Sequence, residues 1–154
     1  MSRHYFGPAI AILLALGIGD ATTCLWAQED PGPPMALRQC GDCHMIFPAQ
    51  MLPKRSWTAI LSRLDDHFGE VASIPPNDLE SIRDYLTSHS ADSPNAIARD
   101  RHYLSEILPD SVPTRITQTA WWNQMHADFD FNGVKHSSIR SPANCLACHQ
   151  QGVH

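Results

Sequence analysis

Two five-residue stretches decide how this chain folds: CGDCH at residues 40–44 and CLACH at residues 145–149. Each has two cysteines three positions apart and a histidine directly after the second, which is the C-x-x-C-H pattern of covalent haem c attachment. Two thiols one helical turn apart can form thioethers with the two vinyl groups on one edge of a porphyrin. The following imidazole then reaches the iron from the proximal side. The sequence therefore predicts two haem c groups, attached through Cys40, Cys43, Cys145 and Cys148, with iron bound by His44 and His149.

Three other uses of paired cysteines compete with this interpretation. A four-cysteine zinc site would not require a histidine after either pair. A thioredoxin-like redox pair needs a βαβ setting, and neither motif has one. Disulfides between residues three apart would constrain a helix very little. Because the same residue order occurs twice, we favour haem attachment.

The first 27 residues resemble a targeting segment rather than part of the fold. Residues 8–18, PAIAILLALGI, are an uninterrupted apolar run that is short for a membrane span and suits the core of a signal peptide. The sequence predicts cleavage after Ala27 or after Ala21, and an uncleaved membrane anchor is the competing interpretation. We therefore expect a periplasmic protein, with residues 1–27 as a signal peptide.

Composition and charge narrow the function further. The 154-residue chain is 43% hydrophobic and 18% charged, as expected of a folded domain, and twelve prolines favour short helices separated by turns. Its formal net charge of −5 argues against a nucleic-acid partner, which would need a basic surface.

The apolar spacing predicts helices throughout the mature chain. Helices are expected at about residues 35–43, 56–68 with Ser56 as N-cap, 77–88, 96–108, 119–127, and from Pro142 through the second motif. No segment alternates with a period of two, so the fold class is all-α, with short helices packed around two haems. A polar stretch at residues 90–96 suggests two lobes, an N-terminal haem lobe at 28–90 and a C-terminal haem lobe at 91–154.

Each iron also has a second axial position that needs a ligand. Five histidines could supply it: His67, His89, His102, His126 and His136. We favour His67 and His126, because both lie on apolar helix faces beside a large flat side chain, Phe68 and Trp122 respectively. His89 is the next choice, while the other two have polar neighbours that suit solvent-exposed positions. Met51 and Met125 are competitors, whereas Met45 is too close to His44 to reach the opposite side of the same ring.

Several longer stretches resemble one family, the small dihaem cytochromes c of proteobacteria. The similarity includes LPKRSW, HFG, RIT, TAWWNQMH and SPANC, and it covers nearly all of the mature chain. It implies bis-histidine ligation, with His67 in the HFG stretch and His126 before the second haem. Where the family has Pro-Trp, this chain has Ala120-Trp121. The resemblance also implies redox partners, namely a small high-spin oxygen-binding cytochrome c and a membrane b-type cytochrome.

These features together predict an electron-transfer protein rather than an enzyme. Two imidazoles on each iron leave no open position for a substrate, and histidine in place of methionine lowers the reduction potential. Two alternatives remain, a haem enzyme such as a dihaem peroxidase and a gas-binding haem sensor. Both require an open or displaceable axial position. The simplest arrangement pairs His44 with His67 and His149 with His126, although crossed pairing is also possible.

Overall fold

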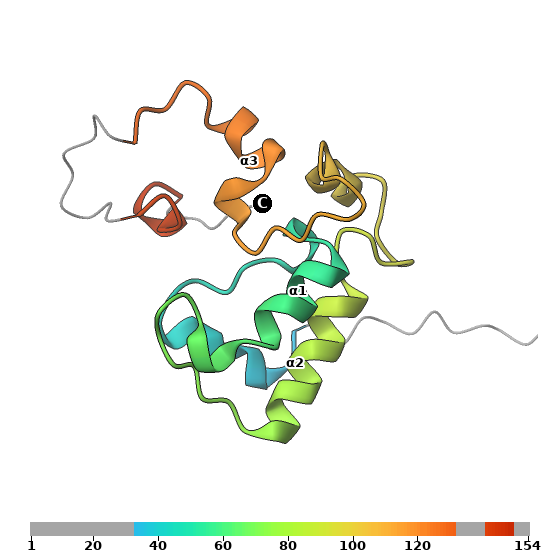
Figure 1. Ribbon diagram of the computed structural model, residues 1–154, viewed down its shortest axis with the longest axis vertical. Coiled ribbons are helices and arrows are strands. Elements are labelled where there is room, and N and C mark those ends of the chain that lie inside the picture. The colour runs from blue at the N-terminus through green and yellow to red at the C-terminus, as the bar shows by residue number, and fades with distance from the viewer. Residues whose placement is uncertain (1–32, 132–140, 150–154) are drawn as a thin grey trace, which may run out of the picture. The chain divides into compact units, whose positions relative to one another are not determined.

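The computed structural model describes residues 33–131 and 141–149, and in this part of the chain every regular element is a helix (Figure 1). The α-helices are α1 (Lys54–Leu61), α2 (Pro76–Ser88) and α3 (Ala120–Met125). The 3₁₀ helices are η1 (Met35–Asp42), η2 (Ala49–Met51), η3 (Leu64–Asp66), η4 (Asp100–Leu104), η5 (Ile116–Gln118) and η6 (Cys145–Ala147). The predicted all-α class is therefore confirmed. No helix of the described residues is long and apolar enough to cross a membrane.

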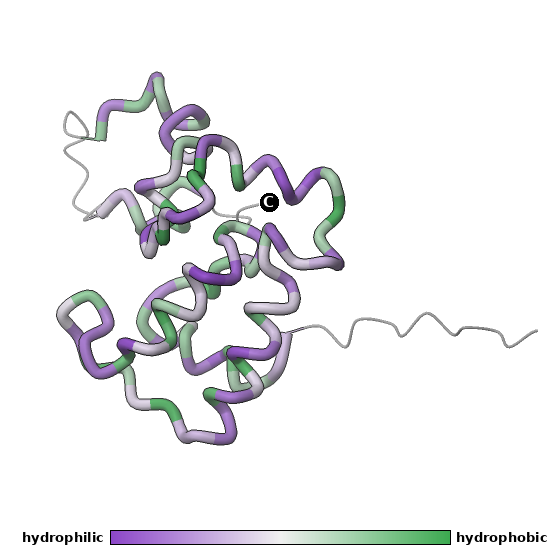
Figure 2. Tube along the Cα trace, turned by 45° about the vertical axis from the view of Figure 1, so that its right-hand side comes forward, coloured by the Kyte–Doolittle hydropathy of each residue, from purple (hydrophilic) through white to green (hydrophobic). Residues whose placement is uncertain are grey.

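The buried core forms where α1 and α2 lie side by side (Figure 1). Trp57 of α1 is buried, and its indole nitrogen donates a hydrogen bond to the Ala49 carbonyl at 2.6 Å. From α2, Ile82 and Leu86 are buried at the four-residue spacing of one helix face. Hydrophobic and hydrophilic residues alternate every few positions along the chain (Figure 2), as they do in amphipathic helices.

The start of α1 is held by a residue from much later in the sequence. Its N-cap is Pro53, which cannot supply a capping oxygen, and the Lys54 amide instead donates to Oδ1 of Asp92 at 2.7 Å. The same carboxylate accepts from the Ser90 hydroxyl at 2.9 Å and lies 3.5 Å from the Arg55 guanidinium. Asp92 therefore satisfies a helix-terminal donor that has no local partner.

Arg55 extends this connection to the loop that follows η4. Its Nε donates to the Ser111 carbonyl at 2.6 Å, and its Nη2 donates to the Leu108 carbonyl at 3.0 Å. We refer to the contacts of Lys54, Arg55 and Asp92 as the α1 clasp. Residues 90–96 were expected to form a polar linker, but Ser90, Ala91 and Ser93 are buried, and the Ala91 amide donates to the Leu52 carbonyl. The burial is possible because these side chains are small, and whether residue 90 separates two lobes stays a prediction.

The helix predicted at residues 56–68 is shorter than expected. It starts at Lys54 rather than after a Ser56 cap, and it ends at Leu61, with Ser62 as C-cap. Beyond Arg63 the backbone turns away, because Ala72 donates to the Leu64 carbonyl and His67 pairs with Glu70. The apolar spacing of residues 64–68 predicts a helix, but only the 3₁₀ turn η3 at Leu64–Asp66 forms, and a tight turn from His67 to Glu70 follows it.

Two further helices are also shorter than predicted, while three lie close to their expected positions. Only Asp100–Leu104 of the region 96–108 is helical, since Glu106 has φ +60°, which a right-handed helix cannot include. The last predicted helix is reduced to η6 around the second motif. The segments η1, α2 and α3 are close to the predicted ranges. The proposed signal segment 1–27 and His136 lie outside the described residues.

Candidate haem-binding sites

The first C-x-x-C-H motif lies on η1, which is fixed to the core at two points. Leu37 of η1 is buried, and Gln39 donates from its side chain to Asp78 of α2 at 2.7 Å. Cys40 follows directly and is half-buried, and burial, followed by the negative charge of Asp42, raises the pKa of its thiol. The motif is therefore presented from a short helix that packs against α2.

His44 comes just after η1, and its ring is oriented by the backbone. Its Nδ1 lies 2.6 Å from the Met45 carbonyl, and because a carbonyl oxygen can only accept, Nδ1 carries the hydrogen. Nε2 is then the nitrogen with the lone pair, the arrangement usual for a histidine that binds a metal. The ring of His67 faces it, with 6.1 Å between centroids and 23° between planes.

His67 is held at the start of a two-residue turn. Its amide donates to the Glu70 carbonyl at 2.7 Å and Glu70 donates back at 3.2 Å, while Phe68 and Gly69 have φ of +59° and +98°. Positive φ at both central residues is the pattern of a type I′ turn, which favours asparagine and glycine. For Phe68 this conformation costs roughly 1–2 kcal/mol.

The environment of His67 favours its neutral form. Burial, and after it the positive charges of His44 and Arg115, lower the pKa of its imidazole below the ordinary histidine value. A histidine must be neutral to bind a metal ion, so a lowered pKa keeps the ring in its coordinating form at neutral pH.

His126, the histidine predicted for the second site, lies at the C-terminal end of α3. The helix begins where the Thr119 hydroxyl accepts from the Trp122 amide, so Thr119 is its N-cap. At the other end the Trp122 carbonyl lies 2.9 Å from Nδ1 of His126, which again leaves Nε2 with the lone pair. The Trp122 ring stacks on the His126 ring at 4.4 Å, and Phe131 stacks on Trp122 at 5.1 Å.

The second motif lies on η6 and brings its histidine to the same place. The His149 amide donates to the Cys145 carbonyl at 2.8 Å, which closes one turn around the motif. Burial raises the pKa of the Cys145 thiol. His126 and His149 are 6.1 Å apart between ring centroids, and their planes are 78° apart.

The two histidine pairs have the spacing that an iron between them requires. A metal–imidazole bond is about 2.0 Å and the ring centroid lies roughly 1.1 Å beyond the nitrogen, so two imidazoles on opposite sides of one metal have centroids about 6 Å apart. Both observed separations are 6.1 Å. The donor set at each motif, two thiols and two imidazoles, thus fits a haem c group.

The competing interpretations of the cysteines find no support in the structure. The thiols of both motifs are free of disulfides: Cys40, Cys43, Cys145 and Cys148. Within the described residues, no group of three or more histidine, cysteine or carboxylate side chains could hold a metal ion directly.

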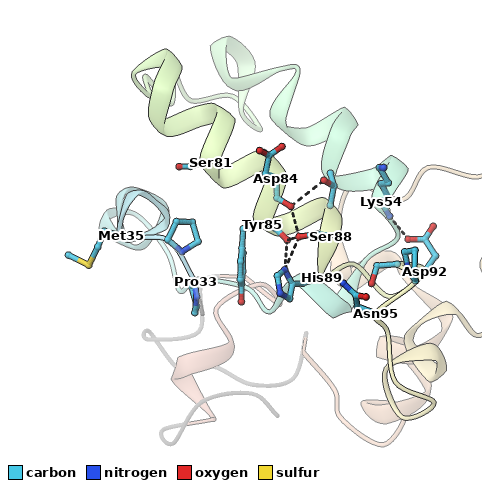
Figure 3. Close-up of a pocket in the computed structure, with 14 residues that line it drawn as sticks. Pro33, Met35, Lys54, Ser81, Asp84, Tyr85, Ser88, His89, Asp92 and Asn95 are labelled. Carbon is cyan, nitrogen blue, oxygen red and sulfur yellow. Dashed lines mark hydrogen bonds between the residues drawn. The ribbon is translucent and has the colours of Figure 1, made fainter. Parts of the chain in front are cut away.

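The other histidine candidates lie in different surroundings. His89 borders an open pocket of about 1020 Å³, where it stacks on Tyr85 and its Nδ1 contacts the Tyr85 carbonyl and the Ser88 hydroxyl (Figure 3). His102 packs against Tyr103 and Trp121, and its Nδ1 contacts the Arg99 carbonyl.

The two methionine competitors differ in their exposure. Met51 is a core residue that is only 4% exposed, whereas Met125 is 63% exposed on α3.

One contact at the first site was missed by the sequence analysis. The guanidinium carbon of Arg115 lies 4.2 Å from the centroid of the Phe68 ring, and this ring in turn packs edge-on against His67 at 4.8 Å. Arg115 is the first residue of the RIT stretch, which supported the family resemblance but did not predict a role for this side chain. The order Phe68-Gly69 is the signal that could have indicated that the Phe68 side chain has a specific contact, because a bulky residue is unusual in such a tight turn.

Comparison with known proteins agrees with this chemistry. The family profile described as dihaem cytochrome c matches residues 36–154. A solved dihaem cytochrome c from Rhodobacter sphaeroides has 35% sequence identity and a TM-score of 0.68, with 80% of this chain and 98% of that chain covered. A dihaem cytochrome c from Shewanella baltica OS155 has 29% identity and a TM-score of 0.58, with 75% and 79% covered. No curated protein sequence matches the chain.

Both the family match and the structural likeness extend over most of the described residues. The profile includes both C-x-x-C-H motifs, and the Rhodobacter structure is covered almost completely. This protein therefore belongs to the dihaem cytochrome c family and is a c-type cytochrome with two haem c groups.

Proposed function

We propose that the protein transfers electrons through two low-spin haems, each with two histidine ligands. The observation that carries this proposal is the 6.1 Å centroid separation in both the His44–His67 and the His126–His149 pair. His44 and His67 would hold the first iron, and His149 and His126 the second. Each haem, when bound, supplies a one-electron couple between ferric and ferrous iron.

The described residues have a specific part in this function. Backbone carbonyls of Met45 and Trp122 hold the hydrogens of His44 and His126 on Nδ1, so Nε2 can coordinate. Two histidines on each iron would keep its ligands the same in both oxidation states, so little rearrangement would accompany electron transfer. They would also leave no site for a substrate or a gas to bind iron.

The decisive experiment removes the two distal ligands one at a time. His67→Ala and His126→Ala should each convert one haem, and only one, to a high-spin form that binds carbon monoxide. Electron paramagnetic resonance (EPR) and carbon monoxide titration measure this, with His89→Ala and His102→Ala as matched controls. If both ligand variants kept two low-spin haems, the ligand assignment would be wrong. Carbon monoxide binding by the reduced wild type would instead favour a gas sensor or a haem enzyme.

We also propose that the protein works in the periplasm after removal of residues 1–27. The support is the apolar run at residues 8–18 followed by a polar stretch, together with the need to attach haem covalently to thiols. Cell fractionation and N-terminal sequencing should find a soluble form that starts at residue 28 or at residue 22. A chain that retained Met1 and stayed with the membrane would contradict this proposal.

The proposed redox partners are a small high-spin cytochrome c and a membrane b-type cytochrome. The support is the family resemblance of the HFG, RIT and SPANC stretches. Rapid mixing of the reduced protein with an isolated high-spin cytochrome c should show electron transfer that depends on ionic strength, since the chain has a net charge of −5. Transfer no faster than to an unrelated cytochrome would argue against this partner.

A further inference from the structure

Phe68 adopts a conformation that its side chain disfavours. Its φ of +59° belongs to the left-handed region, and the residue is 47% exposed, so burial does not explain the choice of phenylalanine. Backbone strain at a non-glycine residue persists where the side chain has a use. Here the ring packs edge-on against His67, with centroids 4.8 Å apart at an angle of 63°.

Arg115 covers the same ring from another part of the chain. Its guanidinium carbon lies 4.2 Å from the Phe68 centroid, a favourable cation–π distance. The backbone at Arg115 is fixed in place, because the next residue, Ile116, is buried in the core and the Gln118 amide donates to the Arg115 carbonyl. Arg115 therefore restrains Phe68, and Phe68 restrains the turn that carries His67.

The positive charge of Arg115 is also placed to act on the iron site. Arg115 and His67 line one cavity of about 320 Å³. The second cation of this cavity, Arg63, is compensated by Asp66 at 2.9 Å. Among the described residues that line this cavity, Arg115 forms no such ion pair.

We propose that Arg115 is a positioning residue for the N-terminal haem site, which orients His67 through Phe68 and raises the reduction potential of the iron bound there. The proposal rests on the proposed ligation of that iron by His67. Reduction removes one positive charge from the haem, so a fixed cation nearby favours the reduced form. Loss of the charge should lower the potential of this haem alone.

The test uses the fully matured two-haem protein. Arg115→Gln removes the charge, Arg115→Lys keeps it without the planar group, and Phe68→Leu keeps apolar volume without the aromatic ring. Arg83→Gln, on the exposed surface of α2 and outside the cavity, controls for overall charge. Spectroelectrochemical titration gives both potentials. The EPR signal that disappears in His67→Ala identifies the N-terminal haem.

We expect Arg115→Gln to lower the equilibrium constant for reduction of the N-terminal haem roughly threefold to tenfold, up to about 59 mV for a one-electron couple. The other haem should be unchanged, and Arg115→Lys should restore most of the potential. Phe68→Leu should change the EPR signal of the N-terminal haem because it loosens His67. Should Arg115→Gln not mature with two haems, Arg115→Met replaces it, with the same expected shift.

Several results would overturn the inference. These are an unchanged potential in the charge-removing variant, an equal shift of both haems, a shift of the same size in Arg83→Gln, or an unchanged EPR signal in Phe68→Leu. None of them concerns the ligands themselves. A wild-type protein without low-spin bis-imidazole signals would instead refute the proposed ligation, so the two failures can be told apart.

Discussion

The imidazole planes of His44 and His67 lie within 23° of parallel, whereas those of His126 and His149 are 78° apart at the same centroid separation of 6.1 Å. The two pairs therefore have equal spacing but different relative orientations. The difference arises locally, because His67 leaves a tight turn while His126 ends a helix.

This difference predicts two distinguishable EPR signals in the oxidised protein. Nearly parallel imidazole planes separate the two iron d orbitals that overlap with them, which gives a rhombic low-spin signal. Nearly perpendicular planes leave these orbitals close in energy, which gives a highly anisotropic low-spin signal. We expect His67→Ala to remove the rhombic signal and His126→Ala to remove the anisotropic one. Two identical rhombic signals would show that the second pair is not perpendicular in the matured protein.

Mass spectrometry should find two covalently attached haems on each chain. The double variant Cys145→Ala/Cys148→Ala should keep only one, because thioethers then remain possible at Cys40 and Cys43 alone. Cys40→Ala/Cys43→Ala is the matched variant, and it should likewise keep one haem, attached at Cys145 and Cys148. Extraction of either haem from the wild type by acidified acetone would contradict covalent attachment.

Gly69→Ala should destabilise the protein by about 1–2 kcal/mol, because the residue has φ +98° and an L-residue is strained there. A Cβ at this position meets no atom within 4 Å, so the loss is conformational rather than steric. Denaturant unfolding followed by helical circular dichroism measures it. Gly41→Ala is the control, because its Cβ would lie 3.4 Å from Ile46 Cγ1 in ordinary contact without positive φ. Equal losses for both variants would argue against the strained turn.

Asp92→Ala should cost about 1–3 kcal/mol of unfolding free energy, because it leaves the Lys54 amide, the Ser90 hydroxyl and Arg55 without their common partner. Asp92→Asn keeps an oxygen for the Lys54 amide and should lose less. Glu80→Ala, at an exposed position of α2, should change the free energy by less than about 0.5 kcal/mol. A loss for Asp92→Ala no larger than that for Glu80→Ala would show that the clasp does not stabilise the fold.

The sequence predicted the helical class and both haem motifs because each depends on local information. Residue order within five positions identifies C-x-x-C-H, and apolar spacing within thirteen residues identifies α2 at Pro76–Ser88. The same spacing misplaced the end of α1, because a periodic pattern cannot show that His67 forms its backbone hydrogen bonds with Glu70.

Contacts between distant residues could not be read from the sequence. Asp92 lies 38 positions after Lys54, and no pattern in either segment predicts the hydrogen bond between them. The contact of Arg115 with Phe68 is of the same kind, since it joins two segments whose spatial relation depends on the complete fold. The pairing of each proximal histidine with a particular distal one has the same origin, and one chain alone left it open.

The α1 clasp has a consequence for the order of events as the chain is made. A polypeptide emerges N-terminus first, so the cap of α1 becomes available only when residue 92 has appeared. The acceptors of Arg55 at Leu108 and Ser111 appear later still. The first haem motif, at residues 40–44, is thus exposed well before the helix pair beside it is secured. A maturation enzyme that acts on the emerging chain would therefore meet Cys40 and Cys43 before the contacts of the α1 clasp can form.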